Sequence, residues 1–235
     1  MAQPYFIFNG KDSREMGVVV ETLPTIQRPR RKITRYDVTG RDGALEVDEG
    51  GYDGYTTTMK INAFGQKLET LNAWLDGDGW FITSDEPDRQ LWVVMDAQLK
   101  GTRYNVSGAC YDSITITLYI HPWRYIIPTD ASTEYTEFPI AITNPYAWES
   151  RPKITVEGSG EITLTVNANM MTFNDITDGI IIDSELMDCM NLTKTALMNA
   201  HANIDEFPTF QSGSNMISVS GTVTKITVEP RWRVL

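Results

Sequence analysis

The segment FPTFQSGSNMISVSGTVTKITVEPRWRVL, residues Phe207 to Leu235, indicates the fold class of this chain. Between Ile217 and Val228, apolar residues alternate with polar ones. A period of two residues is typical of a half-buried β-strand. We expect a turn at Gly213-Ser214-Asn215 and a closing β-hairpin that stops at Pro230. Because the segment holds no residue type that commonly carries catalysis, it favours a structural or binding module over an enzyme.

Composition indicates a soluble globular protein that folds in the cytoplasm. The chain has 235 residues, of which 41% are hydrophobic and 22% charged, enough for one large or two small domains. It has neither a long apolar run that would span a bilayer nor the features of a secretion signal at its beginning. Cys110 and Cys189 are too few for a disulfide framework, so we expect two reduced, buried thiols.

Negative charge is concentrated in the second half of the chain. The net charge is −11; residues 1–128 carry 14 Lys and Arg against 17 Asp and Glu, and residues 129–235 carry 6 against 14. An acidic protein repels nucleic-acid phosphates, which disfavours tight binding of DNA or RNA. An acidic surface would, however, suit a passage through which DNA moves without sticking.

The first half has the pattern of a β-rich domain with one helix. Leu68, Leu71 and Leu75 recur at helical spacing, which predicts a helix over Gln66–Asp76 that ends at Gly77. The glycines of GRDG, residues 40–43, predict a turn, and we expect residues 48–54 to form a loop. Strands are predicted over residues 5–9, 18–21, 32–38, 55–64, 80–83, 91–99, 104–106 and 113–121.

A cluster of prolines between residues 122 and 145 indicates a domain boundary, after which the chain is almost wholly β. Residues 153–157 and 161–166 flank Gly158-Ser159-Gly160 as a predicted hairpin, and residues 170–174 and 179–183 are expected to pair. Residues 184–199 could form a helix, but the context favours a strand followed by a loop. Short strands at this spacing are typical of a β-sandwich.

Two groups of residues are candidates for an interaction surface. Arg28-Pro29-Arg30-Arg31-Lys32, with Arg41 in the following turn, is the strongest positive cluster; it is either a solvated loop or a contact with acidic surface on another subunit. Tyr146 and Trp148 could stack against sugar rings, although packing in the core or between domains is the simpler interpretation of such large side chains.

The sequence predicts no catalytic or metal site and no cofactor. His121 and His201 are the only histidines, and neither lies near a serine in the spacing of a nucleophile elbow. The run Asp76-Gly77-Asp78-Gly79 begins like a calcium-binding loop, but Trp80 occupies the third ligand position and no glutamate closes the loop. We therefore interpret the acidic clusters as solvated turns.

Taken in order, five segments resemble the distal tail protein family of long-tailed phages. They are FIFNGKDSREMGVVVE, RPRRKITRYDVTGRDGALEVDEGGYDGYTTTMKI, NPYAWESRPKITVEGSG, GIIIDSE and FPTFQSGSNMISVSGTVTKITVEPRWR. Each motif alone is weak, but together they span nearly the whole chain. Where the family has a glycine after Asn-Pro, this chain has Tyr146, so the local turn is open to question.

The resemblance implies a mainly β protein with two domains. Residues 1–128 would form an N-terminal ring-forming domain with one helix that docks the tail tube, and residues 129–235 a C-terminal galectin-like β-sandwich. Six copies would form a ring at the virion tail tip, assembled in the host bacterial cytoplasm. Its partners would be the tail tube protein, the tail-tip hub or tail-associated lysin, and the receptor-binding protein. DNA would pass through the ring without specific binding.

Two other classes of function stay open at this point. A glycan-binding module would use the sandwich, with Tyr146 and Trp148, to contact the host cell wall. A hydrolase is disfavoured by the residue inventory. For the structural hub, we expect Arg28, Arg30, Arg31, Lys32 and Arg41 to contribute to the ring interface or to tube docking.

Overall fold

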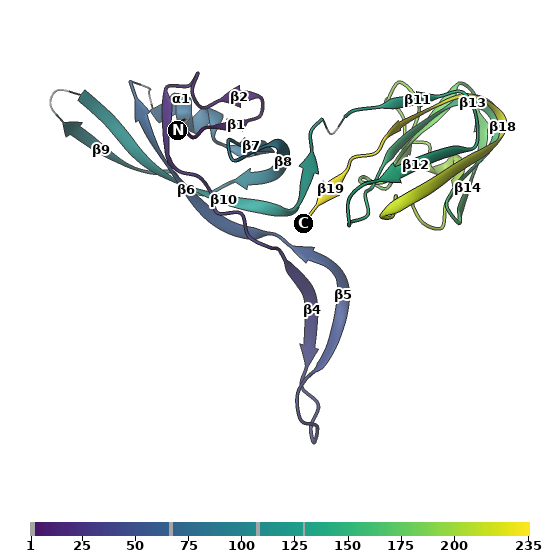
Figure 1. Ribbon diagram of the computed structural model, residues 1–235, viewed down its shortest axis with the longest axis horizontal. Helices are drawn as coiled ribbons and strands as arrows, with labels where there is room; N and C mark the ends of the chain where they lie inside the picture. The colour runs from purple at the N-terminus through teal and green to yellow at the C-terminus, as the bar shows by residue number, and fades with distance from the viewer. Residues whose placement is uncertain (1–2, 66–67, 107–108, 129) are drawn as a thin grey trace. The chain divides into compact units, whose positions relative to one another are not determined.

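The computed structural model describes residues 3–65, 68–106, 109–128 and 130–235, which form two compact units (Figure 1). Unit 1 comprises the residues up to Arg124 together with Leu235, and unit 2 comprises Tyr125–Val234. The chain thus leaves unit 1 at Arg124 and returns to it at Leu235. Each unit has a hydrophobic core of its own.

Unit 1 is built on an antiparallel sheet in the order β2-β1-β7-β8-β10-β6-β3, with β9 pairing with β10 beside it. Its elements are β1 (Phe6–Phe8), β2 (Lys11–Asp12), β3 (Val18–Thr22), β4 (Arg30–Tyr36), β5 (Leu45–Asp53), β6 (Tyr55–Phe64), α1 (Leu68–Trp74), β7 (Gly77–Thr83), β8 (Glu86–Met95), β9 (Lys100–Val106) and β10 (Ala109–Ile126). Strands β4 and β5 pair with each other in a separate two-stranded sheet.

The core of unit 1 follows the alternation in the sequence. Every second residue of β10 from Ile114 to Ile120 is fully buried, as the period of two predicts. The predicted helix is confirmed as α1; Gln66 and Lys67 lie outside the described residues. Trp74 stacks on Phe6 with ring centroids 5.3 Å apart, and its Nε1 donates a hydrogen bond to the carbonyl of Phe8 over 3.3 Å. The helix is therefore attached to β1 by both packing and a hydrogen bond.

Unit 2 is a bent antiparallel sheet whose central pair is β13 and β18 (Figure 1). Its elements are β11 (Thr133–Tyr135), β12 (Ile140–Asn144), β13 (Lys153–Val166), β14 (Asn169–Ile176), β15 (Gly179–Asp183), β16 (Asp188–Met190), the 3-10 helix η1 (Asn199–His201), β17 (Ala202–Asn203), β18 (Gly213–Glu229) and β19 (Arg233–Val234). Inward side chains from both ends of β13 and β18 share one core. The mainly β fold with one α-helix is as predicted.

Two predicted hairpins of unit 2 are wrong, because the glycines lie inside long strands. Residues 153–166 form the single strand β13, and the last segment contributes the single strand β18 instead of a hairpin. A Cβ on Gly158 would lie 2.3 Å from the carbonyl oxygen of Thr222, and one on Gly221 would lie 2.3 Å from that of Glu161. These glycines thus let two backbones pass closely where the strands bend.

Further corrections concern pairing and loops. Strands β14 and β15 do not pair with each other as predicted; they pair with successive halves of β13. The predicted turn at Gly213–Asn215 is the start of β18. Residues 48–53 of the predicted loop belong to β5, because the positive φ angles of Gly50 and Gly51 form a bulge that lets the strand continue. The strand and loop expected over residues 184–199 are confirmed by β16 and the turns around it.

Candidate functional site

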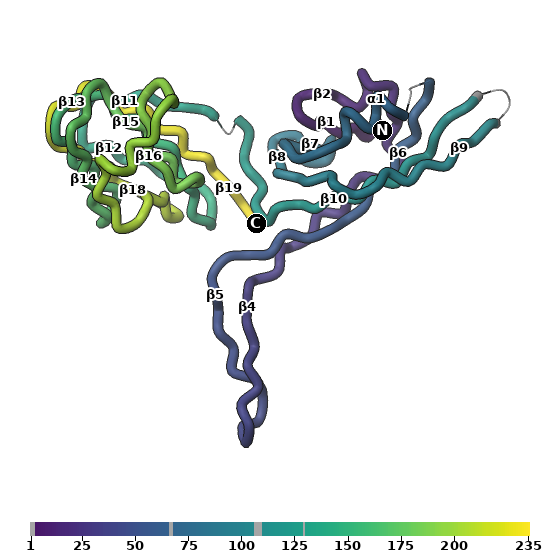
Figure 2. Tube along the Cα trace, turned by 180° about the vertical axis from the view of Figure 1, so that it is seen from behind, coloured from purple at the N-terminus to yellow at the C-terminus, as the bar shows by residue number. Residues whose placement is uncertain are grey.

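Strands β4 and β5 form a two-stranded ribbon, here called the arm, that runs out from the sheet of unit 1 (Figures 1 and 2). The predicted GRDG turn lies in the loop that joins the two strands, where Gly40 and Gly43 have positive φ angles. At the base of the arm, Tyr52 packs edge-on against Trp123 with ring centroids 5.7 Å apart. No residue of β4 or β5 is fully buried. The arm therefore has little hydrophobic core of its own.

One face of the arm is ionic. Arg35 lies opposite Glu46 and pairs with it at 2.8 Å, and Arg31 pairs with Asp48 at 3.0 Å. Nearer the base of the arm than Arg35, Lys32 lies 3.9 Å from Asp53. These contacts neutralise much of the positive charge that the sequence concentrates in this segment. They also hold β4 and β5 in register, because opposite charges face each other across the ladder.

The other face of the arm is apolar and exposed. Tyr36 lies directly opposite Leu45, and Val47 lies on the same face two residues further along β5. These side chains are 53%, 42% and 43% exposed. A two-stranded hairpin is only marginally stable in water, and contiguous exposed apolar surface marks an interaction site. This face of the arm is therefore suited to burial against another surface.

The basic residues predicted as an interface all lie on the arm or just before it, but only some of them have a carboxylate partner. Arg31 and Lys32 have carboxylate partners within β5. Within the described residues, Arg28, Arg30 and Arg41 have no ion pair. Strand β4 begins at Arg30, two residues before the strand that the sequence predicted from residue 32. The charges free for a partner are thus at the base of the arm and in its turn.

A second exposed apolar surface of unit 1, here called the aromatic row, crosses β6, β10 and β9. Phe64 and Tyr104 lie opposite Tyr111 on either side of it, so the three side chains share one face. Tyr111 stacks on Phe64 with centroids 5.2 Å apart and on Tyr104 at 5.4 Å. Phe64 and Tyr104 are among the exposed large hydrophobic residues. The alternation in the sequence marks the strands, but only strand pairing brings these three rings together.

Tyr146 and Trp148 lie in the turn after β12 and are both half-buried. Asn144 shapes this turn: its Oδ1 accepts a hydrogen bond from the Tyr146 backbone N–H at 3.0 Å, and its Nδ2 donates to the Trp148 carbonyl at 2.9 Å. The amide side chain thus organises the turn that contains Tyr146. A role for the two rings in glycan contact stays a prediction.

The described residues contain no group of three or more His, Cys, Asp or Glu side chains arranged to hold a metal ion. His121 belongs to unit 1 and His201 to unit 2. In the described part of the chain, no helix is long and apolar enough to cross a membrane.

The comparison with solved structures gives a match over the full length of the chain. The crystal structure of SPP1 Dit (gp 19.1), described as a paradigm of the hub adsorption apparatus in phages that infect Gram-positive bacteria, superposes with a TM-score of 0.73. The match covers 100% of both chains at 13% sequence identity. No family model and no curated protein sequence matches the chain. The fold of both units is therefore that of SPP1 Dit.

Proposed function

We propose that this protein is a structural hub of the tail tip of a long-tailed phage, without enzymatic activity. Six copies would form a ring that joins the tail tube protein to the tail-tip hub or tail-associated lysin and to the receptor-binding protein. The full-length likeness to SPP1 Dit, a hub protein, supports this class of function.

The observation that carries the proposal is the unburied apolar face of the arm. Tyr36, Leu45 and Val47 present it on a hairpin with no core of its own, so the arm gains stability when a partner covers this face. A second copy of the chain offers an exposed apolar surface of a different kind, the aromatic row of Phe64, Tyr104 and Tyr111.

These two surfaces suit a closed ring. In cyclic assemblies beyond the dimer, one surface of each copy meets a different surface of the next, and every copy uses both. In the proposed ring, the arm of one copy covers the aromatic row of its neighbour. Arg30 and Arg41, which have no ion pair within the described chain, would pair with acidic groups of the neighbour or of the tube protein.

The acidic character of the chain is compatible with a passage for DNA. With a net charge of −11, a ring of six copies would repel phosphates and not retain the genome. Rings in which lumen Asp and Glu residues are replaced by Lys should retain DNA or slow its passage in a translocation assay. An unchanged rate would count against this role of the charge.

Negative-stain microscopy of the purified chain, alone and mixed with the neighbouring tail proteins, tests the proposal. We expect six-fold rings in at least one of the two preparations. In the Tyr36→Ser, Leu45→Ser double variant, rings should be lost while each unit stays folded by circular dichroism. The Arg35→Gln, Glu46→Gln variant is the matched control, because it changes the ionic face of the same arm. Absence of rings in both wild-type preparations would refute the proposal.

A further inference from the structure

The aromatic row belongs to a larger pattern on one face of β6, β10 and β9, which lie side by side in that order (Figures 1 and 2). Four residues along β10 from Tyr111, Thr115 lies between Lys60 of β6 and Lys100 of β9. Side chains at every second position of a strand share a face, so the two lysines lie on the face of the aromatic row. The positions between them and the row are uncharged and hold Asn62, Ser113 and Thr102.

Neither lysine has a partner of opposite charge. Lys60 and Lys100 are exposed, and neither forms an ion pair within the described residues. On the opposite face of the same strands, by contrast, Arg103 pairs with Asp112 at 2.8 Å. Only β10 separates the two lysines, so their Cα atoms lie roughly 10 Å apart. Their long side chains can therefore reach the same acidic segment of a partner.

The stacking within the aromatic row shows which kind of surface fits beside these lysines. Neighbouring rings lie 5.2 and 5.4 Å apart and are inclined by only 29° and 20°. This separation is close to the spacing of adjacent strands, so the three rings stand side by side and cover the faces between them. Bases of nucleic acids stack on exposed ring faces, whereas this row directs ring edges outward. The row therefore suits an apolar protein surface better than a nucleic acid.

The arm carries opposite charges at its two ends. Its turn holds Asp37 and Asp42, which have no ion pair within the described residues, and Arg41 is the one cation between them. At its base, Arg28 and Arg30 are the residues without a carboxylate partner. A pair of lysines attracts the carboxylates of the turn and repels the arginines of the base. Charge thus selects one of the two directions in which an arm can lie across the row.

The spacing of the groups along the two elements agrees with this direction. On β10, four residues separate Tyr111 from Thr115, which corresponds to roughly 14 Å. On the arm, Asp42 lies three residues before Leu45 and five before Val47, at most about 10 and 17 Å away. When the apolar face of the arm covers the aromatic row, the turn therefore reaches the lysines.

We propose that Lys60 and Lys100 bind the carboxylates of Asp37 and Asp42 in the arm of a second copy of the chain. The inference rests on the proposed ring and adds the direction in which each arm lies. Contact between the apolar faces is not directional, so it supplies attraction, whereas the ion pairs fix the orientation. Each copy gives its turn to one neighbour and receives the turn of the other neighbour on its lysines.

Exchanging the charges of the two sites tests this contact. Lys60→Glu with Lys100→Glu, and Asp37→Lys with Asp42→Lys, should each raise the protein concentration needed for rings by about tenfold or more, because like charges then meet. Sedimentation velocity measures assembly in the preparation in which the wild type forms rings. All four side chains are exposed, so the melting temperature should not change.

The matched control for the lysine variant is Lys11→Glu with Lys194→Glu. It makes the same change of charge at exposed positions outside the arm and outside β6, β9 and β10. Its rings should form at the wild-type concentration.

Mixing the two charge variants should restore the ring. In a ring of six in which the variants alternate, every unchanged turn meets unchanged lysines, and every turn with two new lysines meets two new glutamates. The equal mixture, and a single chain with all four substitutions, should therefore form rings at the wild-type concentration. Failure of both rescues, or charge variants that assemble like the control, would overturn the proposed contact and leave the ring itself standing.

Two further outcomes are distinguished by the same samples. A lysine variant that assembles like the control but binds duplex DNA less tightly than the wild type would assign the lysines to nucleic acid and overturn the contact with the arm. Absence of rings from every wild-type preparation would refute the ring and this contact together.

Discussion

Arg231 forms a bidentate ion pair with Asp183: its two terminal nitrogens lie 2.7 and 2.8 Å from the two carboxylate oxygens. The Asp183 side chain is 4% exposed and that of Arg231 20%. Asp183 Oδ1 also accepts hydrogen bonds from the backbone N–H groups of Glu185 and Leu186. The pair therefore ties the residues after β18 to the turn after β15, and so joins two of the sequence motifs, GIIIDSE and the segment that ends in RWR.

Replacing Asp183 with Asn should destabilise unit 2 by about 3 kcal/mol at pH 7, because it leaves the guanidinium without its partner. Urea denaturation of the full chain measures this loss. Glu46→Gln, which breaks an exposed ion pair of the arm, is the control and should have little effect.

The stability supplied by Asp183 should depend on pH. Burial raises the pKa of this carboxyl, but the hydrogen bonds and charge of Arg231 outweigh burial, so the pKa lies below its usual value. A lowered pKa in the folded state gives stability that is present above the unfolded pKa, about 3.9, and is lost as pH falls through the folded pKa. The difference in free energy of unfolding between the wild type and Asp183→Asn should therefore be smaller at pH 3 than at pH 7. An equal difference at both pH values would contradict the idea that the charge of Asp183 supplies this stability.

The bend of the central strands should depend on Gly221. An alanine there would have a φ of +106° and a Cβ 2.3 Å from the carbonyl oxygen of Glu161. We therefore expect Gly221→Ala to lower the free energy of unfolding by roughly 3 kcal/mol. Gly160 is the matched control: its φ is +82°, but nothing lies within 4 Å of an added Cβ, so Gly160→Ala should cost only about 1 kcal/mol. Chemical denaturation of the two variants compares them directly. Similar losses would mean that steric contact does not set the bend.

Much of the fold was predictable because burial imposes a period. The alternation in β6 and β10 and the spacing of Leu71 and Leu75 in α1 follow directly from which side chains face a core. The glycines were harder to interpret, because glycine occurs in turns and at close backbone contacts equally well. Residues 158–160 and 213–215 read as turns, but pairing with a distant strand decides their conformation.

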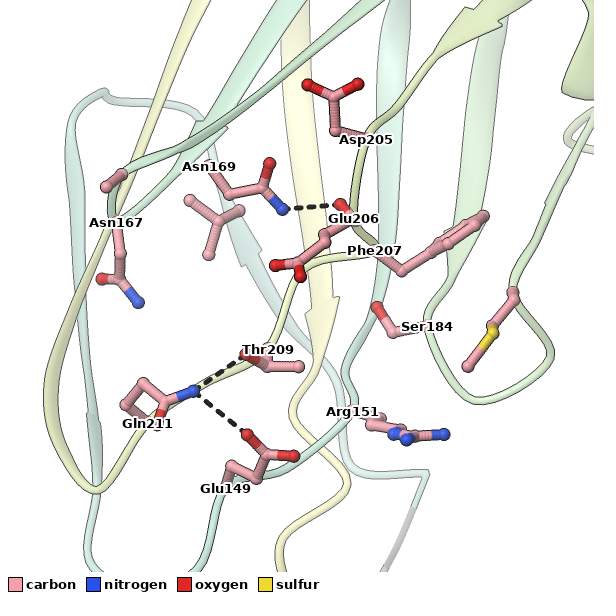
Figure 3. A pocket seen from close by; sticks show the side chains of 13 residues that line it. Glu149, Arg151, Asn167, Asn169, Ser184, Asp205, Glu206, Phe207, Thr209 and Gln211 are labelled. Carbon is pink, nitrogen blue, oxygen red and sulfur yellow. Dashed lines mark hydrogen bonds between the residues drawn. The ribbon is translucent and has the colours of Figure 1, made fainter. Parts of the chain in front are cut away.

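The candidate surfaces were harder to predict than the strands. The basic run from Arg28 to Lys32 is visible in the sequence, but the carboxylates that neutralise Arg31 and Lys32 come from β5 and become partners only through the register. The aromatic row depends on the pairing of three strands, and the pocket of unit 2 lined by Glu149, Asn167 and Phe207 collects side chains from separate segments (Figure 3). Neither has a local signal in the sequence.

The two surfaces proposed for the ring can be tested by mixing. A variant with a defective arm, Tyr36→Ser with Leu45→Ser, and one with a defective row, Phe64→Ser with Tyr104→Ser, should each fail to form rings. Mixed together, they should form dimers and stop, because only one intact arm meets one intact row. Light scattering coupled to size exclusion measures the masses. Rings in the mixture, or in either variant alone, would exclude this pairing.

Charge reversal should distinguish free from paired arginines of the arm. Arg30→Glu and Arg41→Glu should weaken ring assembly, most clearly at low ionic strength, because salt screens exposed charges. Arg31→Glu is a different case, since it also breaks the pair with Asp48 and places like charges together on the arm. Its effect should include a loosened arm, seen as faster proteolysis in β4 and β5. Intact hexamers in the Arg30→Glu and Arg41→Glu variants would show that these two charges do not contribute to the interface.

The two thiols should differ sharply in reactivity. The prediction of two buried thiols is wrong for Cys110, which is exposed. Cys189 is buried, and burial followed by the charge of Asp188 raises its pKa to about 12. Because the thiolate is the reactive form, a disulfide reagent at pH 8 should modify Cys110 at once and Cys189 only after denaturation. Cys110→Ser should abolish the fast reaction. A fast reaction that persists in this variant would mean that unit 2 opens readily around β16.

The point at which the chain leaves and re-enters unit 1 has a consequence for how such proteins diversify. The guanidinium of Arg124 donates a hydrogen bond to the carbonyl of Leu235 over 2.6 Å, and at the edge of unit 2 the Ile126 N–H bonds to the Trp232 carbonyl over 2.9 Å. Residues 125–234 therefore form an insertion whose first and last residues lie close together. Residues 125–234 can thus be exchanged for another module with neighbouring ends while the rest of the chain stays unchanged, so unit 1 can be combined with new surface chemistry in a single recombination step.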